Sequence, residues 1–163
     1  MPAHATGPRR SAEEQNRLEG EIRQLYERKV AFHQLLGLRV LSLDPAAPRI
    51  RFDMRPELVG HVSSGRLHGG VTATVLDSTA GLALMLAISE KFADESAVQV
   101  LHRIGRMGTI DMRIDYLRQG VGRFFIAGAR VTRLGGRIGS AHMELHGDDG
   151  ALVATGAASY VIS

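Results

Sequence analysis

The chain has 163 residues, of which 44% are hydrophobic, a size and composition that suit one domain with a buried core. It contains no cysteine, which excludes disulfides, a thiol nucleophile and thiolate metal ligands. The formal charge of +3 comes from scattered arginines and tryptophan is absent, so there is little material for stacking nucleic-acid bases, and no nucleic-acid partner is expected. The first ten residues lack the apolar stretch of a secretory signal, and we expect a cytoplasmic protein.

The N-terminal segment predicts a single long helix. We expect residues 1–10 to be disordered. Ser11, followed three residues later by Glu14, resembles a capping box, so an amphipathic helix is expected over residues 11–36, and Gly37 offers a stop. Apolar positions at helical spacing could form its buried stripe: Leu18, Ile22, Leu25, Tyr26, Val30, Phe32 and Leu36.

Two short strands are expected next, over residues 38–43 and 49–54. In the second strand apolar residues alternate with Arg51 and Asp53, so one of its faces meets water. Residues 56–66 are expected to form a loop that leads into the central helix of the chain.

Residues 69–88 predict a long and almost wholly apolar helix. Because its side chains leave no solvent face, we expect the rest of the chain to surround it. A run of roughly 20 residues is also long enough to cross a bilayer. Asp77 argues against that reading, since a carboxylate near mid-span would cost about 3 kcal/mol. We therefore interpret the segment as a buried core helix and expect no membrane span.

Asp77 is the one ionisable group inside this apolar helix, where a carboxylate is costly unless it is paired, hydrogen-bonded or functional. The helix begins at His68-Gly69-Gly70, whose glycines let another group approach the backbone closely. The first amides of a helix lack intrahelical partners, and the helix dipole favours negative charge there. The pattern predicts an anion site, and an oxyanion is one such anion. A core helix entered through a Gly-Gly turn is the alternative reading.

The remaining third predicts a sheet. Residues 89–108 show only a possible short strand at 98–101, and a turn is expected at Asp148-Asp149-Gly150. Alternating patterns predict four strands, over residues 109–116, 124–133, 139–146 and 152–162. Short connections between them indicate an antiparallel meander. The whole order favours an α+β fold in which an antiparallel sheet wraps around one long helix, within a single domain over residues 11–163.

Leu67-His68-Gly69-Gly70, with Asp77 nine residues after His68, resembles the hotdog-fold acyl-CoA thioesterases of the PaaI type. The resemblance extends from about residue 35 to the end of the chain. The segment 97–108 and the ending 154–160 look most similar to the YigI-like thioesterase subgroup. The resemblance implies a hotdog fold and hydrolysis of acyl-CoA to a free acid and coenzyme A. A non-catalytic acyl-CoA-binding or sensing module is the alternative, and a hotdog dehydratase or hydratase is a third.

The same resemblance implies roles for individual residues. Asp77 would be the general base or the nucleophile at the thioester carbonyl. An amide of Gly69 or Gly70 would polarise that carbonyl and hold the developing oxyanion. His68 would be structural or lie near the thioester, and Thr109 matches a hydroxyl position that orients the attacking water.

Arg133 and Arg137 fall where such proteins meet the phosphates of coenzyme A, although a solvated hairpin is an equal reading. Coenzyme A would enter as part of the substrate, so no separate cofactor is expected. No Asp, Glu or His spacing suggests a metal site.

One position departs from the family pattern. Many relatives carry an asparagine six residues before the histidine, and this chain has Val62 there. Either His61, Ser63 or Ser64 replaces it in binding the substrate, or the site is adapted to another acyl group. An exposed loop histidine is the alternative for His61.

The spacing of the two catalytic groups favours a dimer. Asp77 lies seven residues after Gly70, which is about 10 Å along a helix. A base has to come within about 3 Å of its target, so one helix cannot easily present both groups to one carbonyl. Two helices related by a two-fold axis can. We therefore predict a site at a homodimer interface, and a homotetramer is also typical of the family.

Overall fold

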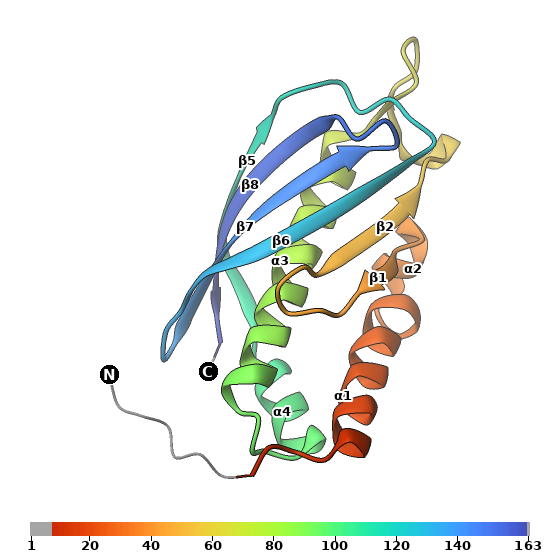
Figure 1. The fold of residues 1–163 in the computed structure, drawn as a ribbon. Coiled ribbons are helices and arrows are strands. Elements are labelled where there is room, and N and C mark those ends of the chain that lie inside the picture. The colour runs from red at the N-terminus through yellow and green to blue at the C-terminus, as the bar shows by residue number, and fades with distance from the viewer. Residues whose placement is uncertain (1–7, 163) are drawn as a thin grey trace.

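A long central helix, α3 (Gly69–Lys91), lies against one face of a six-stranded antiparallel sheet (Figure 1). The structure is a computed structural model that describes residues 8–162. The sheet has the order β1-β2-β6-β7-β8-β5. Its strands are β1 (Arg39–Ser42), β2 (Arg49–Asp53), β5 (Gly108–Tyr116), β6 (Phe124–Leu134), β7 (Ile138–Gly147) and β8 (Leu152–Val161). The buried helix and the antiparallel sheet confirm the α+β hotdog fold expected from the sequence.

The apolar side chains of α3 form the centre of the core. Leu76, Leu82 and Leu84 are wholly buried. Within residues 8–162, α3 alone is long and apolar enough to cross a bilayer, but most of that stretch is enclosed, as a core helix is. Its first turns are less covered, since Gly70 is exposed and Thr74 is half-buried.

The meander predicted for the last four strands is only partly correct. β6, β7 and β8 are neighbours in chain order, but β5 pairs with β8 at the edge of the sheet and not with β6. The chain leaves β5, passes the ends of β8 and β7 and enters β6, as Figure 1 shows. β6 has no free side for β5, because β2 and β7 occupy both. This arrangement brings the first residues of β5 against the last residues of β8.

The N-terminal helix predicted over residues 11–36 is interrupted. α1 (Ala12–Gln24) continues into a π-helical segment, η1 (Leu25–Lys29), and the backbone becomes extended at Val30. A short helix, α2 (Ala31–Leu36), follows and ends at Gly37 in the left-handed conformation, as expected. The break turns α2, so Phe32 is 52% exposed and the prediction that it joins the buried stripe is wrong.

The short strand considered at residues 98–101 is also wrong, because these residues lie in α4 (Ala97–Ile104). Ser96 and Gln99 form a complete capping box in which each side chain accepts from the other residue's amide. Val100 and Ile104 are buried at helical spacing. The capping pair and this spacing were the helix signals in the segment.

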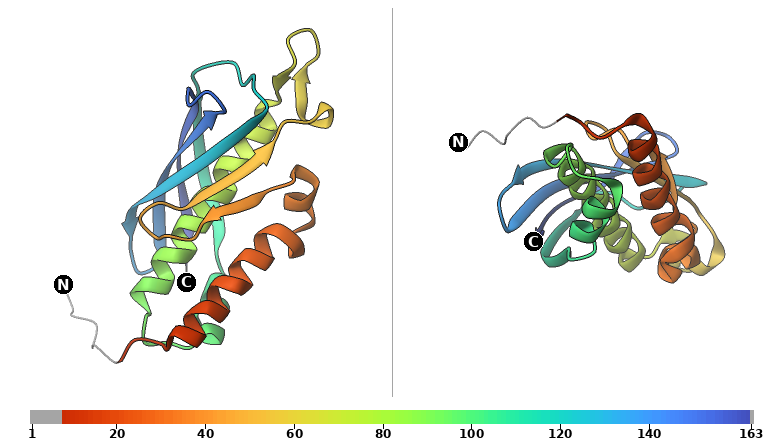
Figure 2. Two further views of the ribbon diagram at one scale, coloured as in Figure 1. Left: turned by 45° about the vertical axis from the view of Figure 1, so that its right-hand side comes forward. Right: turned by 90° about the horizontal axis from the view of Figure 1, so that it is seen from below.

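Residues 56–66 contain more structure than the predicted loop. A 3-10 turn, η2 (Pro56–Leu58), leads into a small hairpin of β3 (Val59–His61) and β4 (Arg66–Leu67). The hairpin projects from the end of the molecule where α3 begins (Figure 2).

Disorder was predicted for residues 1–10. Residues 1–7 of this segment lie outside the described residues. The side chain of Arg9 donates to Glu90, and that of Arg10 donates to the carbonyls of Ser89 and Phe92. These contacts hold residues 9 and 10 against the end of α3.

Candidate active site

The carboxylate of Asp77 lies between the central helix and two strands of the sheet. The Thr109 hydroxyl donates to Oδ1 of Asp77 at 2.9 Å. The Tyr160 hydroxyl donates to the same oxygen at 2.5 Å and to the Asp77 main-chain carbonyl at 2.7 Å. Thr109 and Tyr160 are paired across β5 and β8, so the register of this strand pair brings both hydroxyls to one carboxylate. Within residues 8–162 the other oxygen, Oδ2, has no hydrogen-bond partner.

Two further aromatic groups lie under this part of α3. The buried Tyr26 hydroxyl donates to the Ser78 carbonyl at 2.7 Å, and the Ser78 hydroxyl lies 3.0 Å from Nε2 of His33. Burial raises the pKa of Tyr26, and the charge of Asp77 raises it further. Burial lowers the pKa of His33, which favours the neutral imidazole. Both shifts favour the neutral forms of Tyr26 and His33.

Tyr160 is the residue of this site that sequence reasoning missed. Burial raises its pKa above the ordinary range, and the hydrogen bond and charge of Asp77 add to the shift, so the hydroxyl remains a proton donor. Its contact depends on the pairing of β8 with β5, which no local pattern specifies. The signal in the sequence was a lone aromatic residue directly after the run of small residues at 154–159.

The N-terminus of α3 has one unoccupied amide. His68 is the N-cap, and its Nδ1 accepts a hydrogen bond from the Gly70 amide at 2.9 Å. The His68 carbonyl accepts from the next two amides, those of Val71 and Thr72. Among the described residues the Gly69 amide has no acceptor. Of the two glycines that the sequence offered, Gly69 is therefore the one whose N–H is free for a ligand.

Tyr116 contacts Gly69 from the other side. Its hydroxyl donates to the Gly69 carbonyl at 2.9 Å, and its ring lies where a Cβ at Gly69 would come within 3.4 Å. The end of β5 thus holds the first residue of α3, while the beginning of β5 supplies Thr109.

The residues predicted to replace the family asparagine lie together on the β3–β4 hairpin. Nδ1 of His61 is 3.1 Å from the Ser63 hydroxyl and 3.0 Å from the Ser64 hydroxyl. Val62 is 92% exposed at the hairpin tip. The structure groups His61 and Ser64 with each other and does not bring them into contact with Asp77.

Arg133 and Arg137 lie on the hairpin between β6 and β7, at the opposite end of α3 from Gly69. Both side chains are exposed. Lys91, at the end of α3, donates to the Gly135 carbonyl in this hairpin at 3.1 Å. The two arginines thus lie near the C-terminal end of α3, separated from Asp77 by the second half of that helix.

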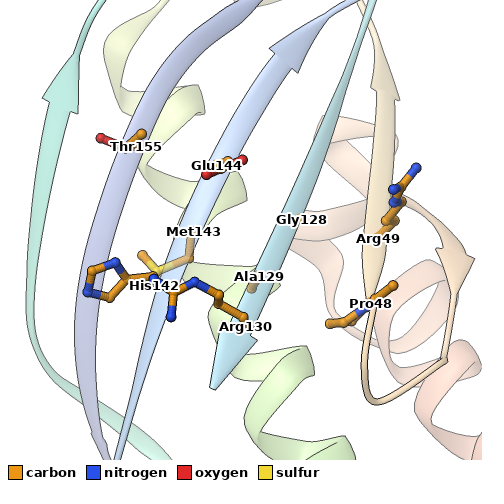
Figure 3. A pocket seen from close by; sticks show the side chains of 10 residues that line it. Pro48, Arg49, Gly128, Ala129, Arg130, His142, Met143, Glu144 and Thr155 are labelled. Atoms are coloured by element: carbon orange, nitrogen blue, oxygen red, sulfur yellow. The ribbon is translucent and has the colours of Figure 1, made fainter. Parts of the chain in front are cut away.

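A hollow of about 250 Å³ on the outer face of the sheet contains none of the predicted site residues. Arg130 and His142 lie close together there, with Glu144 and Thr155 further along the strands (Figure 3). Across residues 8–162, no three acidic or histidine side chains come together as metal ligands would.

The chain is similar to known proteins over most of its length. Residues 64–154 match the model of the thioesterase superfamily, and the chain belongs to this family. It is 34% identical over 152 residues to the medium/long-chain acyl-CoA thioesterase YigI of Salmonella typhimurium, a match that covers 93% of this chain and 96% of that protein. YigI of Escherichia coli K12 is 32% identical over the same shares.

A solved structure is also similar to this chain in fold and sequence. The crystal structure of a thioesterase-superfamily-related protein from Shewanella oneidensis has a TM-score of 0.88 and 35% identity, covering 94% of this chain and 100% of that one. These matches confirm the sequence-based identification of a thioesterase-family enzyme.

Replacing Tyr160 by Phe should lower the free energy of unfolding by about 1.5–3 kcal/mol, because its hydroxyl donates to a carboxylate. Tyr26→Phe is the matched control, since it removes a buried hydroxyl from a neutral carbonyl on the same helix and should cost about 1 kcal/mol. Urea unfolding at one fixed protein concentration measures both. In an Asp77→Asn background the cost of Tyr160→Phe should fall to that of the control; an unchanged cost would contradict the charge-assisted bond.

Proposed function

We propose that this protein hydrolyses acyl-CoA thioesters to a carboxylic acid and coenzyme A. The observation that carries the proposal is the carboxylate of Asp77, with Oδ1 bound by Thr109 and Tyr160 and Oδ2 without a partner among the described residues. The free amide of Gly69 supplies the complementary group, a donor for the thioester carbonyl. The similarity to the YigI thioesterases over 93% of the chain supports acyl-CoA as the substrate.

The hydrogen bonds suit a general base more than a nucleophile. The single hydroxyl proton of Thr109 is donated to Asp77, so its lone pairs can only accept, and a water can donate one proton to Thr109 and the other to Oδ2. The water oxygen then points a lone pair at the carbonyl carbon. Asp77 takes the proton as the C–O bond forms, and the Gly69 amide holds the oxyanion. When the C–S bond breaks, the proton passes from Asp77 to the leaving thiolate.

We propose that the two groups come from different subunits. Asp77 is eight residues after Gly69, about 12 Å along one helix, which exceeds hydrogen-bond reach to a common carbonyl. β5 is an edge strand of the sheet, and Ile110 and Tyr116 on it are each 56% exposed. An unpaired edge of nine residues can pair with the same strand of a second copy around a two-fold axis. A homodimer is the smallest such assembly, and a homotetramer would contain two of them.

Asp77→Asn tests the base directly. Asn keeps the size of the side chain and its hydrogen bonds but takes no proton from water, so kcat should fall by at least about 100-fold while the fold survives. Free-thiol detection with short and long acyl-CoA substrates measures the loss, and circular dichroism checks the fold. Equal turnover in both proteins would refute the role of Asp77. Wild-type binding without turnover would instead indicate an acyl-CoA-binding module.

Gly69→Pro tests the oxyanion donor. Gly69 is the first residue of α3, where proline is tolerated, and His68 before it already has the extended backbone (ψ 133°) that a following proline requires. Proline removes the N–H, and kcat should fall by about 100- to 1000-fold. Gly69→Ala adds a Cβ but keeps the N–H, so it is the matched control. A proline variant as active as the alanine variant would rule out this amide.

Mixing the two inactive variants tests the shared site. Suppose that each site uses Gly69 of one subunit and Asp77 of the other. Half of the dimers in an equal mixture then contain one copy of each variant, and each of these has one intact site. The mixture should therefore regain about a quarter of wild-type turnover. The variants are unfolded and refolded together, and each variant refolded alone is the control. A mixture that stays inactive, although mass spectrometry detects mixed dimers, would mean that one subunit supplies both groups.

A further inference from the structure

Two tyrosine hydroxyls bind consecutive main-chain carbonyls of α3, at the turn that carries Asp77. Tyr160 of β8 donates to the Asp77 carbonyl at 2.7 Å. Tyr26 of η1 donates to the Ser78 carbonyl, also at 2.7 Å. Because successive residues of an α-helix are about 100° apart around its axis, the two hydroxyls approach the helix from different directions. The backbone that carries the proposed base is therefore held both from the sheet and from the N-terminal segment.

His33 adds a side-chain contact at the same turn. Its Nε2 lies 3.0 Å from the Ser78 hydroxyl, and its ring lies against that of Tyr26, with the ring centroids 4.9 Å apart. Gly81, in the next turn of α3, leaves room for the Tyr26 hydroxyl, because a Cβ at Gly81 would come within 3.3 Å of that oxygen. Ser78 is thus bound at its hydroxyl by His33 and at its carbonyl by Tyr26. We name these three residues the Ser78 cluster.

The interruption of the N-terminal helix brings the members of the Ser78 cluster together. Tyr26 and His33 are seven residues apart in sequence, a separation of about 10 Å along an uninterrupted α-helix. The π-helical segment η1 and the extended backbone at Val30 place the two rings in contact instead. π-Helical turns are rare and frequently lie at functional sites. The break therefore directs two side chains of the N-terminal segment to one turn of α3.

We propose that the Ser78 cluster positions Asp77, so that the N-terminal helices contribute to kcat; this inference rests on the proposed thioester hydrolysis. Among the described residues the Asp77 carboxylate binds Thr109 and Tyr160 but no member of the cluster, so the cluster acts through the backbone of α3. A misplacement of about 1 Å can lower the rate of an enzyme about 100-fold. Two members of the cluster precede residues 64–154, the range that matches the family model. The inference thus extends the site beyond that range.

His33→Ala tests the cluster, because alanine removes the contact with the Ser78 hydroxyl. The kcat should fall about tenfold with KM unchanged, since a displaced base weakens only the transition state. His33→Gln should regain most of the rate, because the side-chain amide of glutamine can reach the Ser78 hydroxyl. Thr79→Val is the matched control: its buried hydroxyl donates within α3, to the Val75 carbonyl, so its loss should lower stability and leave kcat unchanged.

Ser78→Ala removes the same contact from the other side. Its kcat should fall to a similar extent, and the double variant with His33→Ala should be no slower than either single variant, because both changes remove one hydrogen bond. Circular dichroism checks the fold of every variant, and Ser78→Ala replaces the comparison if His33→Ala folds poorly. Losses in kcat that simply multiply in the double variant, or a glutamine variant as slow as the alanine variant, would overturn the proposed positioning.

A readout that needs no turnover separates this inference from the proposed function. The carboxyl-carbon NMR resonance of Asp77, assigned from its loss in Asp77→Asn, reports the surroundings of the carboxylate. It should shift in His33→Ala and return in His33→Gln, whereas Thr79→Val should leave it in place. Absence of wild-type turnover on every acyl-CoA would refute the hydrolysis, and the resonance would still decide the positioning. An unmoved resonance, or an unchanged kcat in His33→Ala beside an active wild type, would overturn the cluster and leave the hydrolysis intact.

Discussion

The carboxylate of Asp77 is held by two strands at once, and the proposed chemistry depends on this contact. Thr109 at the start of β5 and Tyr160 near the end of β8 both donate to Oδ1, so the carboxylate has one fixed orientation. Burial keeps the Tyr160 hydroxyl protonated by raising its pKa. The apolar packing of α3 against the sheet therefore sets the geometry of a polar site, because it decides how far the helix stands from the two hydroxyls.

At the beginning of α3, two side chains likewise bind different backbone groups. His68 satisfies the Gly70 amide with its ring and two later amides with its carbonyl, which leaves the Gly69 N–H available. Tyr116 holds the Gly69 carbonyl, so the same strand that orients Asp77 through Thr109 also positions the first residue of the helix. Residues of β5 thus contact both the base and the residue that carries the proposed oxyanion donor. β5 is also the edge strand at which we propose that two copies meet.

Local sequence patterns predicted the helices and strands of this protein better than the contacts between them. The apolar run of α3, its isolated Asp77 and the His68-Gly69-Gly70 entry were visible because they depend on neighbours in sequence. The contact of Tyr160 with Asp77 was not, since it requires β5 to pair with β8 across a long separation, and short connections favour pairing with β6 instead. The break at Val30 was missed because the apolar stripe continues through it, although its backbone leaves the helix.

The position of β8 between β7 and β5 has a consequence for the order of folding. Within the described sheet, β5 has no other strand to pair with, so after synthesis it must wait until β6, β7 and β8 have all emerged. Contacts of high sequence separation form slowly, because the loop has to be closed before they stabilise anything. During that interval β5 exposes both of its edges, and α3 lacks one side of its cover. The catalytic cluster is thus completed only with the closing strand, so a nascent chain would acquire its fold and its site in the same final step.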